Sequence, residues 1–253
     1  MSRPADAVID CSDLVIDRIG HSGSARAVDG VTFTLRPGEM TCVAGPTGSG
    51  KSTLVIALTG QDDPSVQIVG GSAEVCGINV RRGGRKRRML GALTGYIPQA
   101  AGANLPPRLT VEEAIAEPIT IRERRVNRQA LAVRVATLLD EMHLPLGMAE
   151  KFPYELSAGM RQRVAIARSL VLEPHVLIAD EPLANLDTEM RPVVFDAFAR
   201  RRKERGMATL FVSNNEAFAR ELGATTLMIR EGHVIARGIG SDLVWTPGSG
   251  PTY

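Results

Sequence analysis

The sequence of 253 residues predicts an α/β fold, and three observations favour it. Short apolar runs of strand length occur on both sides of the middle of the chain, at residues 40–44, 176–179 and 209–212. The middle itself, about residues 104–165, shows helical spacing and no strand pattern. The composition, with 44% hydrophobic and 23% charged residues, is ordinary for a globular protein and excludes disordered and fibrous classes. We therefore expect one domain over residues 1–240.

The first part of the chain predicts an antiparallel β portion followed by a strand, a loop and a helix. Residues 8–19 mix apolar and acidic side chains, residues 31–35 alternate apolar side chains with threonines, and residues 36–39 read as a turn. The apolar run described above then leads into a glycine-rich loop at 45–50 and a helical stretch at 51–58. This order of elements is typical of a nucleotide-binding turn between strand and helix.

The middle of the chain predicts an all-helical insertion. Residues 110–113, Thr-Val-Glu-Glu, match a capping box, so a helix is expected to begin there. Apolar residues recur at helical spacing across residues 131–142. Ser157 precedes a run to Val171 that lacks glycine and proline after Gly159.

The last part of the chain returns to alternating strands and helices. Pro192 suits the first turn of a helix that ends near Gly206. Residues 227–229 and 234–236 flank a turn and predict a hairpin. The end of the chain, residues 241–253, contains prolines and glycines and is expected to be loosely held.

Charge and cysteine patterns limit the expected partners and location. Lys and Arg number 30 against 28 Asp and Glu, and the net charge of +2 gives no overall attraction to nucleic acid. Basic clusters at 81–88 and 200–203 lack interleaved aromatic side chains, so no nucleic acid partner is expected. Three cysteines without a C-x-x-C pair favour a reducing compartment. The longest uncharged stretch, 89–107, is interrupted by glycines and prolines, so any membrane role should depend on another polypeptide.

The glycine-rich loop carries a phosphate-binding pattern, G-x-x-x-x-G-K-[ST]. Glycines let successive backbone N–H groups turn toward phosphate oxygens, and the helix N-terminus adds partial positive charge. Lys51 supplies a cation for the terminal phosphates, and the Ser52 hydroxyl is a candidate Mg²⁺ ligand. The predicted ATP-binding residues are Gly45, Pro46, Thr47, Gly48, Ser49, Gly50, Lys51, Ser52 and Thr53.

Two adjacent carboxylates follow the apolar run at residues 176–179. Ligands of parallel sheets lie at the carboxyl ends of the strands, which places Asp180 and Glu181 at the predicted site. Adjacent residues of an extended chain face opposite ways, so different roles are expected. We assign Asp180 to Mg²⁺ and Glu181 to the attacking water, as the catalytic residue.

Between these two elements the chain reads Leu-Ser-Ala-Gly-Met-Arg-Gln-Arg at residues 156–163, and here it resembles the ATP-binding cassette (ABC) family, whose signature is LSGGQ. The resemblance spans about residues 13–238 and is greatest to cassettes of peptide and nickel importers. It implies a P-loop NTPase core of the RecA-like type, with ATP and Mg²⁺ as cofactors. It also implies that the signature residues contact ATP bound by a partner cassette; these are Ser157, Ala158, Gly159 and Met160.

The same resemblance implies further roles and partners. Gln99 looks like the Q-loop glutamine, a ligand of ATP-bound Mg²⁺, and Asp187 lies in a sequence like the D-loop. The implied function is an ATP-hydrolysing, energy-coupling subunit of a membrane transporter, cytoplasmic and peripheral on the inner face of the cell membrane. Its partners would be permease subunits and a second cassette, in a homodimer or a heterodimer. The alternative is a regulatory or structural cassette that binds ATP and dimerises but hydrolyses slowly.

Two positions depart from the family's pattern. The family's switch histidine has no counterpart here, because the chain reads Ser213-Asn214-Asn215. Asparagine can donate a hydrogen bond to a γ-phosphate but cannot hold a proton, so slow turnover is expected. Either the chain pairs with a cassette whose histidine is intact, or Asn214 substitutes adequately in a homodimer. Arg18 stands where the family stacks an aromatic ring on adenine; a guanidinium plane can also stack, and loose base selectivity is expected.

Overall fold

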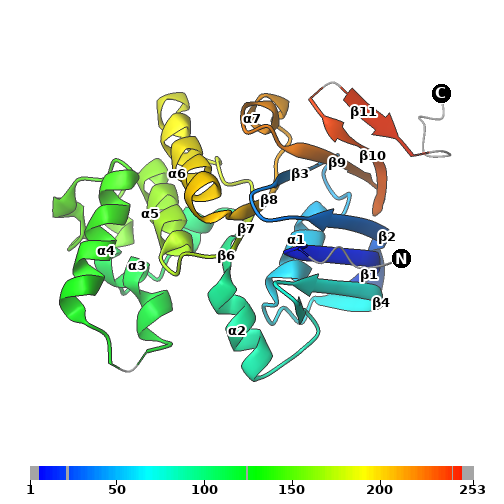
Figure 1. The fold of residues 1–253 in the computed structure, drawn as a ribbon. Coiled ribbons are helices and arrows are strands. Elements are labelled where there is room, and N and C mark those ends of the chain that lie inside the picture. The colour runs from blue at the N-terminus through cyan, green and yellow to red at the C-terminus, as the bar shows by residue number, and fades with distance from the viewer. Residues whose placement is uncertain (1–5, 21–22, 124, 241, 247–253) are drawn as a thin grey trace.

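The computed structural model describes residues 6–20, 23–123, 125–240 and 242–246, which form two β-sheets connected by helices (Figure 1). The strands are β1 (Ile9–Gly20), β2 (Gly23–Leu35), β3 (Met40–Ala44), β4 (Val66–Val75), β5 (Ile78–Asn79), β6 (Thr94–Ile97), β7 (Val176–Asp180), β8 (Ala208–Val212), β9 (Thr225–Arg230), β10 (His233–Ile239) and β11 (Asp242–Trp245). The α-helices are α1 (Lys51–Thr59), α2 (Arg85–Leu93), α3 (Val111–Thr120), α4 (Arg128–Glu141), α5 (Ala158–Leu170), α6 (Arg191–Arg205) and α7 (Glu216–Glu221). Short 3₁₀ turns are η1 (Ala101–Asn104), η2 (Leu146–Met148), η3 (Pro153–Glu155) and η4 (Thr188–Met190).

The larger sheet has the strand order β11-β10-β9-β3-β8-β7-β6, in which the neighbours from β9 to β6 are parallel. The smaller sheet is antiparallel, with the order β2-β1-β4-β5. Residues of β3, β7 and β8 are buried on both faces of the larger sheet, which explains their unbroken apolar runs in the sequence.

Two hydrophobic clusters cover the two faces of the larger sheet. On one face, Val43, Ile178 and Leu210 pack with α1 and the smaller sheet. On the other, Leu177 and Phe211 pack with α3, α4, α5, α6 and α7. Figure 1 shows α3, α4 and α5 at the opposite end of the molecule from the smaller sheet. This arrangement leaves the carboxyl ends of the parallel strands between the two parts.

The helices of the middle segment begin where the sequence predicts. Thr110 caps α3 with its hydroxyl accepting from the Glu113 N–H at 3.2 Å, and the Glu113 carboxylate accepts from the Thr110 N–H at 2.9 Å. Ser157 caps α5, accepting from the Met160 N–H at 3.2 Å. Helix α5 continues to Leu170, because its last turns pack against β6 of the larger sheet.

Two elements differ from the sequence-based expectations. Helix α7, capped by Asn215, and strand β11 were not predicted. Part of the segment expected to be loosely held is strand β11, which pairs with β10 through Ile239 and Asp242. Gly240 adopts a positive φ of 60°, which permits the tight reversal between these strands. Residues 247–253 of the expected tail lie outside the described residues. In the part of the chain that the structure describes, no helix is both long and apolar enough to span a bilayer.

Candidate nucleotide and magnesium site

Four neighbouring parallel strands deliver the predicted site residues to one edge of the larger sheet. Val43 of β3 pairs with Val212 of β8, and Val212 in turn pairs with Asp180 of β7. Ala179 of β7 pairs with Ile97 of β6. The segments that leave these strand ends carry the glycine-rich loop, the switch position, the paired carboxylates and Gln99, in the spatial order β3, β8, β7, β6. The parallel register therefore gathers segments that are up to 169 residues apart in the sequence.

The loop from Gly45 to Gly50 needs its first and last glycines because other backbone segments approach them closely. A Cβ at Gly45 would lie 2.0 Å from the Ile229 carbonyl oxygen, and one at Gly50 would lie 2.0 Å from the Ala27 carbonyl oxygen. Both glycines also have positive φ, 145° and 100°. Because these two residues have no side chain, the loop can pack directly against the backbones of β9 and β2.

Polar groups of this loop fit a bound phosphate. The Lys51 ammonium donates to the carbonyl oxygens of Gly45 and Pro46, at 2.8 and 2.7 Å. The buried Ser49 hydroxyl has no hydrogen-bond partner among the described residues, and a Cβ at Gly48 would meet open space. Helix α1 begins directly after the loop without a side-chain cap, so its first N–H groups remain available to an anion. These features together form a cradle for phosphate oxygens beside a lysine.

Asp180 is a buried carboxylate beside this cradle, with only 2% of its surface exposed. Burial raises the pKa of its carboxyl above the ordinary value, while a hydrogen bond from Ser52 and the charge of Lys51 act in the opposite direction. The Ser52 hydroxyl and the Asp180 carboxylate are therefore adjacent oxygen donors, the ligand type that Mg²⁺ prefers. Among the described residues no group of three or more His, Cys, Asp or Glu forms a metal cluster. A Mg²⁺ ion here would depend on phosphate oxygens and water for its remaining ligands.

Glu181 adopts a left-handed conformation, with φ of 51°, so the extended strand ends at Asp180. The separation of the two carboxylates therefore arises from this turn and not from the strand alternation on which the sequence argument relied. The Glu181 N–H donates to the Val212 carbonyl at 3.1 Å. Burial and, second, the charge of Asp180 raise the pKa of the Glu181 carboxyl, while Lys51 and the Asn214 N–H lower it. Burial and the neighbouring carboxylate thus make Glu181 a stronger base than an exposed carboxylate.

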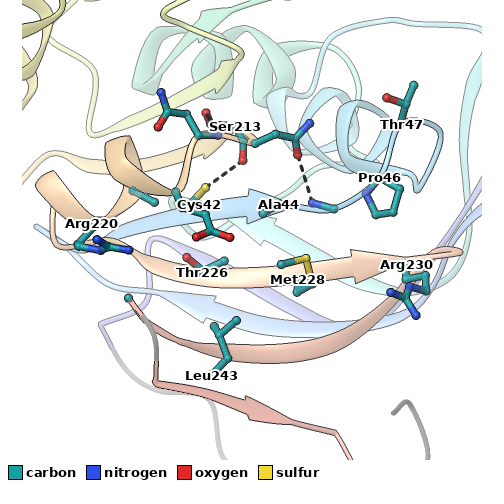
Figure 2. A pocket seen from close by; sticks show the side chains of 16 residues that line it. Cys42, Ala44, Pro46, Thr47, Ser213, Arg220, Thr226, Met228, Arg230 and Leu243 are labelled. Carbon is teal, nitrogen blue, oxygen red and sulfur yellow. Dashed lines mark hydrogen bonds between the residues drawn. The ribbon is translucent and has the colours of Figure 1, made fainter. Parts of the chain in front are cut away.

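Asn214 lies next to the glycine-rich loop. Its side-chain oxygen accepts from the Gly45 N–H at 3.4 Å, one of the dashed lines in Figure 2. Because the oxygen faces Gly45, the amide nitrogen remains the group able to donate to a ligand. Both residues line a cavity of about 510 Å³ whose other walls are formed by β3, β9 and α7; Figure 2 shows Cys42 and Ala44 on β3 with Thr226 and Met228 on β9.

The structure also places the two predicted ligand residues that lie farther from the loop lysine. Gln99 is exposed two residues beyond β6, and its carbonyl oxygen accepts from the Asn104 amide at 3.4 Å. Arg18, on β1, donates from its guanidinium to the Thr53 hydroxyl at 3.3 Å. This contact directs Arg18 toward α1, at the end of the loop opposite to Asn214.

The signature residues form a separate, exposed site at the start of α5. Ser157 and Ala158 are exposed, and Gly159 and Met160 are half-buried. A Cβ at Gly159 would lie 3.0 Å from the carbonyl oxygen of Asn185, so the first turn of α5 packs against the segment that contains Asp187. Asp187, also exposed, precedes η4. In the described part of the chain no hydrogen bond joins Ser157 to the glycine-rich loop.

One residue of the site was missed by the sequence argument. Gln162 is completely buried on α5, and its amide joins the backbone at Gly102 to the backbone at Pro182. A signal was present, because Gln162 lies at helical spacing from the buried residues Ile166 and Leu170 and therefore on the same face of α5.

The fold and the phosphate cradle define a P-loop nucleotide-binding protein. The profile described as ABC transporter matches residues 28–184, more than half of the chain. The chain belongs to the ABC transporter family, as the sequence resemblance predicts.

Two curated relatives and a solved structure are similar to the chain. Peptidoglycan transport ATP-binding protein YejF of Agrobacterium fabrum is 32% identical over 224 residues, which cover 88% of this chain and 40% of that protein. Putative peptide import ATP-binding protein BAB2_1053 of Brucella abortus is 32% identical over 241 residues, 92% of this chain and 71% of that protein. MJ0796, a bacterial ABC transporter cassette solved as a dimer, has a TM-score of 0.83 at 24% identity and covers 91% of this chain and 98% of its own. This similarity confirms the predicted fold.

Proposed function

We propose that the chain is the ATP-hydrolysing subunit of a membrane transporter that imports peptides or related solutes, located on the cytoplasmic face of the membrane. The observation that carries the proposal is the convergence of the phosphate cradle, Asp180 and Glu181 at one sheet edge. The cargo class rests on the names of the relatives, which describe peptide import and peptidoglycan transport. The chain spans only part of these relatives, so cargo and partners are inferences about a larger assembly.

The loop and α1 bind the nucleotide in this mechanism. Backbone N–H groups of the glycine-rich loop and of the first turn of α1 hold the phosphates, and Lys51 exchanges its two loop carbonyl contacts for phosphate oxygens. Ser52, Asp180 and Gln99 would hold Mg²⁺, and the ion would supply positive charge beside the terminal phosphates. Arg18 stacks on the base, with its position fixed by the Thr53 hydroxyl.

Glu181 orients and deprotonates the attacking water. Burial and the charge of Asp180 raise the pKa of the Glu181 carboxyl, and a higher pKa makes its carboxylate a better proton acceptor. The Asn214 N–H and Lys51 limit that rise. Hydrolysis then transfers the γ-phosphoryl group to water, with the proton passing to Glu181.

The site requires a second cassette for completion. The exposed start of α5, with Ser157 and Gly159, presents a hydroxyl and helix N–H groups that can contact the γ-phosphate held by a partner. Closure of the pair on ATP moves the attached permease, and release after hydrolysis resets it.

Asn214 favours an asymmetric pair in which this chain's own site turns over slowly, because an amide cannot carry the positive charge of a protonated histidine. It equally motivates the second candidate, a regulatory cassette that binds ATP and hydrolyses little. The substitution Asn214→His distinguishes these two candidates from a homodimer in which Asn214 already supports full hydrolysis. We expect it to raise hydrolysis in the assembled complex, and an unchanged rate would remove the reason for inferring asymmetry.

The transporter function is tested by isolating the assembly. A tagged Glu181→Gln chain, expected to retain ATP, is purified from gently solubilised native membranes, and co-purifying proteins are identified by mass spectrometry. A permease together with a second cassette is the expected result. The Lys51→Ala chain, expected to hold ATP poorly, is the matched control and should recover less of the cassette partner. Recovery of only soluble ribosomal or DNA-bound proteins would contradict the transporter function.

A further inference from the structure

The amide of Gln162 is the best-enclosed polar contact between α5 and the catalytic edge. The side chain is 0% exposed, and the described residues contain no other fully buried side-chain amide. Its oxygen accepts from the Gly102 N–H at 3.1 Å, and its nitrogen donates to the Pro182 carbonyl at 3.0 Å. Both partners are buried as well, so neither bond can be replaced easily by one to water.

The two bonds fix the orientation of the amide. Gly102 offers a donor and therefore requires the amide oxygen, whereas Pro182 offers an acceptor and requires the amide nitrogen. A carboxylate can satisfy only Gly102, and an apolar side chain of the same length satisfies neither. Glutamine is the residue whose length and polarity match both partners at once.

The backbone leaves no space for another arrangement. A Cβ at Gly102 would lie 2.7 Å from the Gln162 backbone nitrogen, so η1 and α5 are in direct contact. On the other side, the first turn of α5 meets the Asn185 carbonyl at Gly159. The backbone of α5 at Gly159 and Gln162 thus packs between the segment after Gln99 and the segment after Glu181.

We propose that Gln162 is a positioning residue that fixes the Gln99 segment and the Glu181 turn relative to each other, so that movement of α5 displaces both together. Gly102 follows Gln99 by three residues in the chain, and Pro182 follows Glu181 directly. Glu181 is restrained from β8 by its own N–H and from α5 by the bond to Pro182. The inference rests on the proposed ATP hydrolysis, because Gln99 and Glu181 are the groups it positions.

The test compares Gln162→Met, which keeps the length but removes both bonds, with Gln129→Met, a matched substitution at an exposed position of α4. Steady-state hydrolysis and binding of a fluorescent ATP analogue are measured on the full chain in its native assembly, with rates normalised to bound nucleotide. We expect Gln162→Met to lower kcat about tenfold while KM for ATP stays within about twofold, and Gln129→Met to change neither. A residue with only a structural role would lower the melting temperature and the yield but not kcat per nucleotide bound.

Hydrogen exchange supplies a readout that does not depend on activity. In the wild type the Gly102 amide should be protected as well as the amides of α5, and rapid exchange there would overturn the proposal without any substitution. In Gln162→Met the peptides around Gly102 and Pro182 should both exchange faster. Gln162→Glu should speed exchange mainly in the peptide at Pro182, because the carboxylate still accepts from the Gly102 N–H. This variant also allows the test if Gln162→Met does not fold.

The outcomes separate this proposal from the function on which it rests. Hydrolysis by the wild type with an unchanged kcat in Gln162→Met would overturn the role of Gln162 alone. A wild-type assembly that binds ATP and never hydrolyses it would overturn both.

Discussion

The catalytic edge of the larger sheet and the start of α5 differ in how they are held. At the edge, Ser49, Lys51 and Asp180 are buried, and parallel pairing of the strands that carry the edge fixes their relative positions. At the start of α5, Ser157 is exposed, and the only fully buried polar side chain of the helix is Gln162. The groups of the first region are held by contacts within the chain, whereas the start of α5 presents its groups outward.

Ion pairs also join α4 of the helical segment to α6 and to the turn between α5 and β7. Glu141 of α4 is 5% exposed and accepts from Arg201 of α6 at 2.7 Å. Arg134 of α4 and Arg205 of α6 both pair with Glu173, which lies between α5 and β7. The two Glu173 pairs are more exposed and contribute little each, so the attachment of the segment rests mainly on the hydrophobic cluster that it shares with the sheet. The edge therefore carries the groups for the proposed nucleotide chemistry, and the start of α5 carries those for the proposed contact with a partner cassette.

The largest expected effect sharpens the role of the edge in catalysis. Glu181→Gln removes the proposed base and should lower hydrolysis at this chain's own site by about 10²–10⁴-fold, while ATP affinity is retained because the phosphate cradle is unchanged. Phosphate release and nucleotide binding are measured on the same preparation. Glu189→Gln, at an exposed position of η4, is the control and should hydrolyse like the wild type. Equal rates in the two variants would show that Glu181 does not act on water.

Lys51→Ala tests whether the edge also binds the nucleotide. Loss of the ammonium should lower hydrolysis by about 10²–10³-fold and weaken ATP binding as well, which distinguishes it from Glu181→Gln. Titration with a fluorescent ATP analogue gives the affinity, and Lys86→Ala on the exposed face of α2 is the matched control. Wild-type affinity in Lys51→Ala would contradict the assignment of the loop as the phosphate site.

The same comparison explains what the sequence could predict. The glycine-rich loop was predictable because its chemistry depends on backbone N–H groups and fixed local spacing, and the caps of α3 and α5 because their bonds span three residues. The fold class followed from apolar runs buried on both faces of the sheet.

Other features depend on partners far away in the chain and could not be predicted. The two bonds of Gln162 join residues 60 and 20 positions apart, and the helical spacing that places Gln162 on the buried face of α5 does not reveal these partners. The left-handed conformation of Glu181 arises from the tertiary packing around β7 and β8, since glutamate has no preference for it. The hydrogen bond from the Gly45 N–H to the Asn214 side chain likewise joins residues 169 positions apart.

A smaller effect should distinguish the capping role of Ser157 in stability from its proposed contact with a partner cassette. Ser157→Ala removes the N-cap and should lower the free energy of unfolding by about 1 kcal/mol, as should Thr110→Ala at the start of α3. Only Ser157→Ala should also lower hydrolysis in the assembled pair, by about tenfold, because its hydroxyl is the group proposed to contact a partner's phosphate. Melting curves and rates per bound nucleotide are compared for the two variants. Equal losses of rate would mean that Ser157 acts only as a cap.

The smallest expected effect tests the cost of burying carboxylates at the edge. The pKa values of Asp180 and Glu181 are both raised in the folded chain, by burial first, so the folded state binds more protons than the unfolded state between the ordinary and the raised pKa. Stability should therefore fall as pH rises through that window, and the destabilisation should be absent below about pH 4. Glu181→Gln removes one of the two charges and should raise the melting temperature at pH 7 by about 2–4 °C, measured without nucleotide or divalent cation. The gain in melting temperature should vanish below about pH 4, and it should be absent from Glu189→Gln at any pH. A gain that persists at low pH would come from packing. That result would show that burying the two carboxylates does not destabilise the edge.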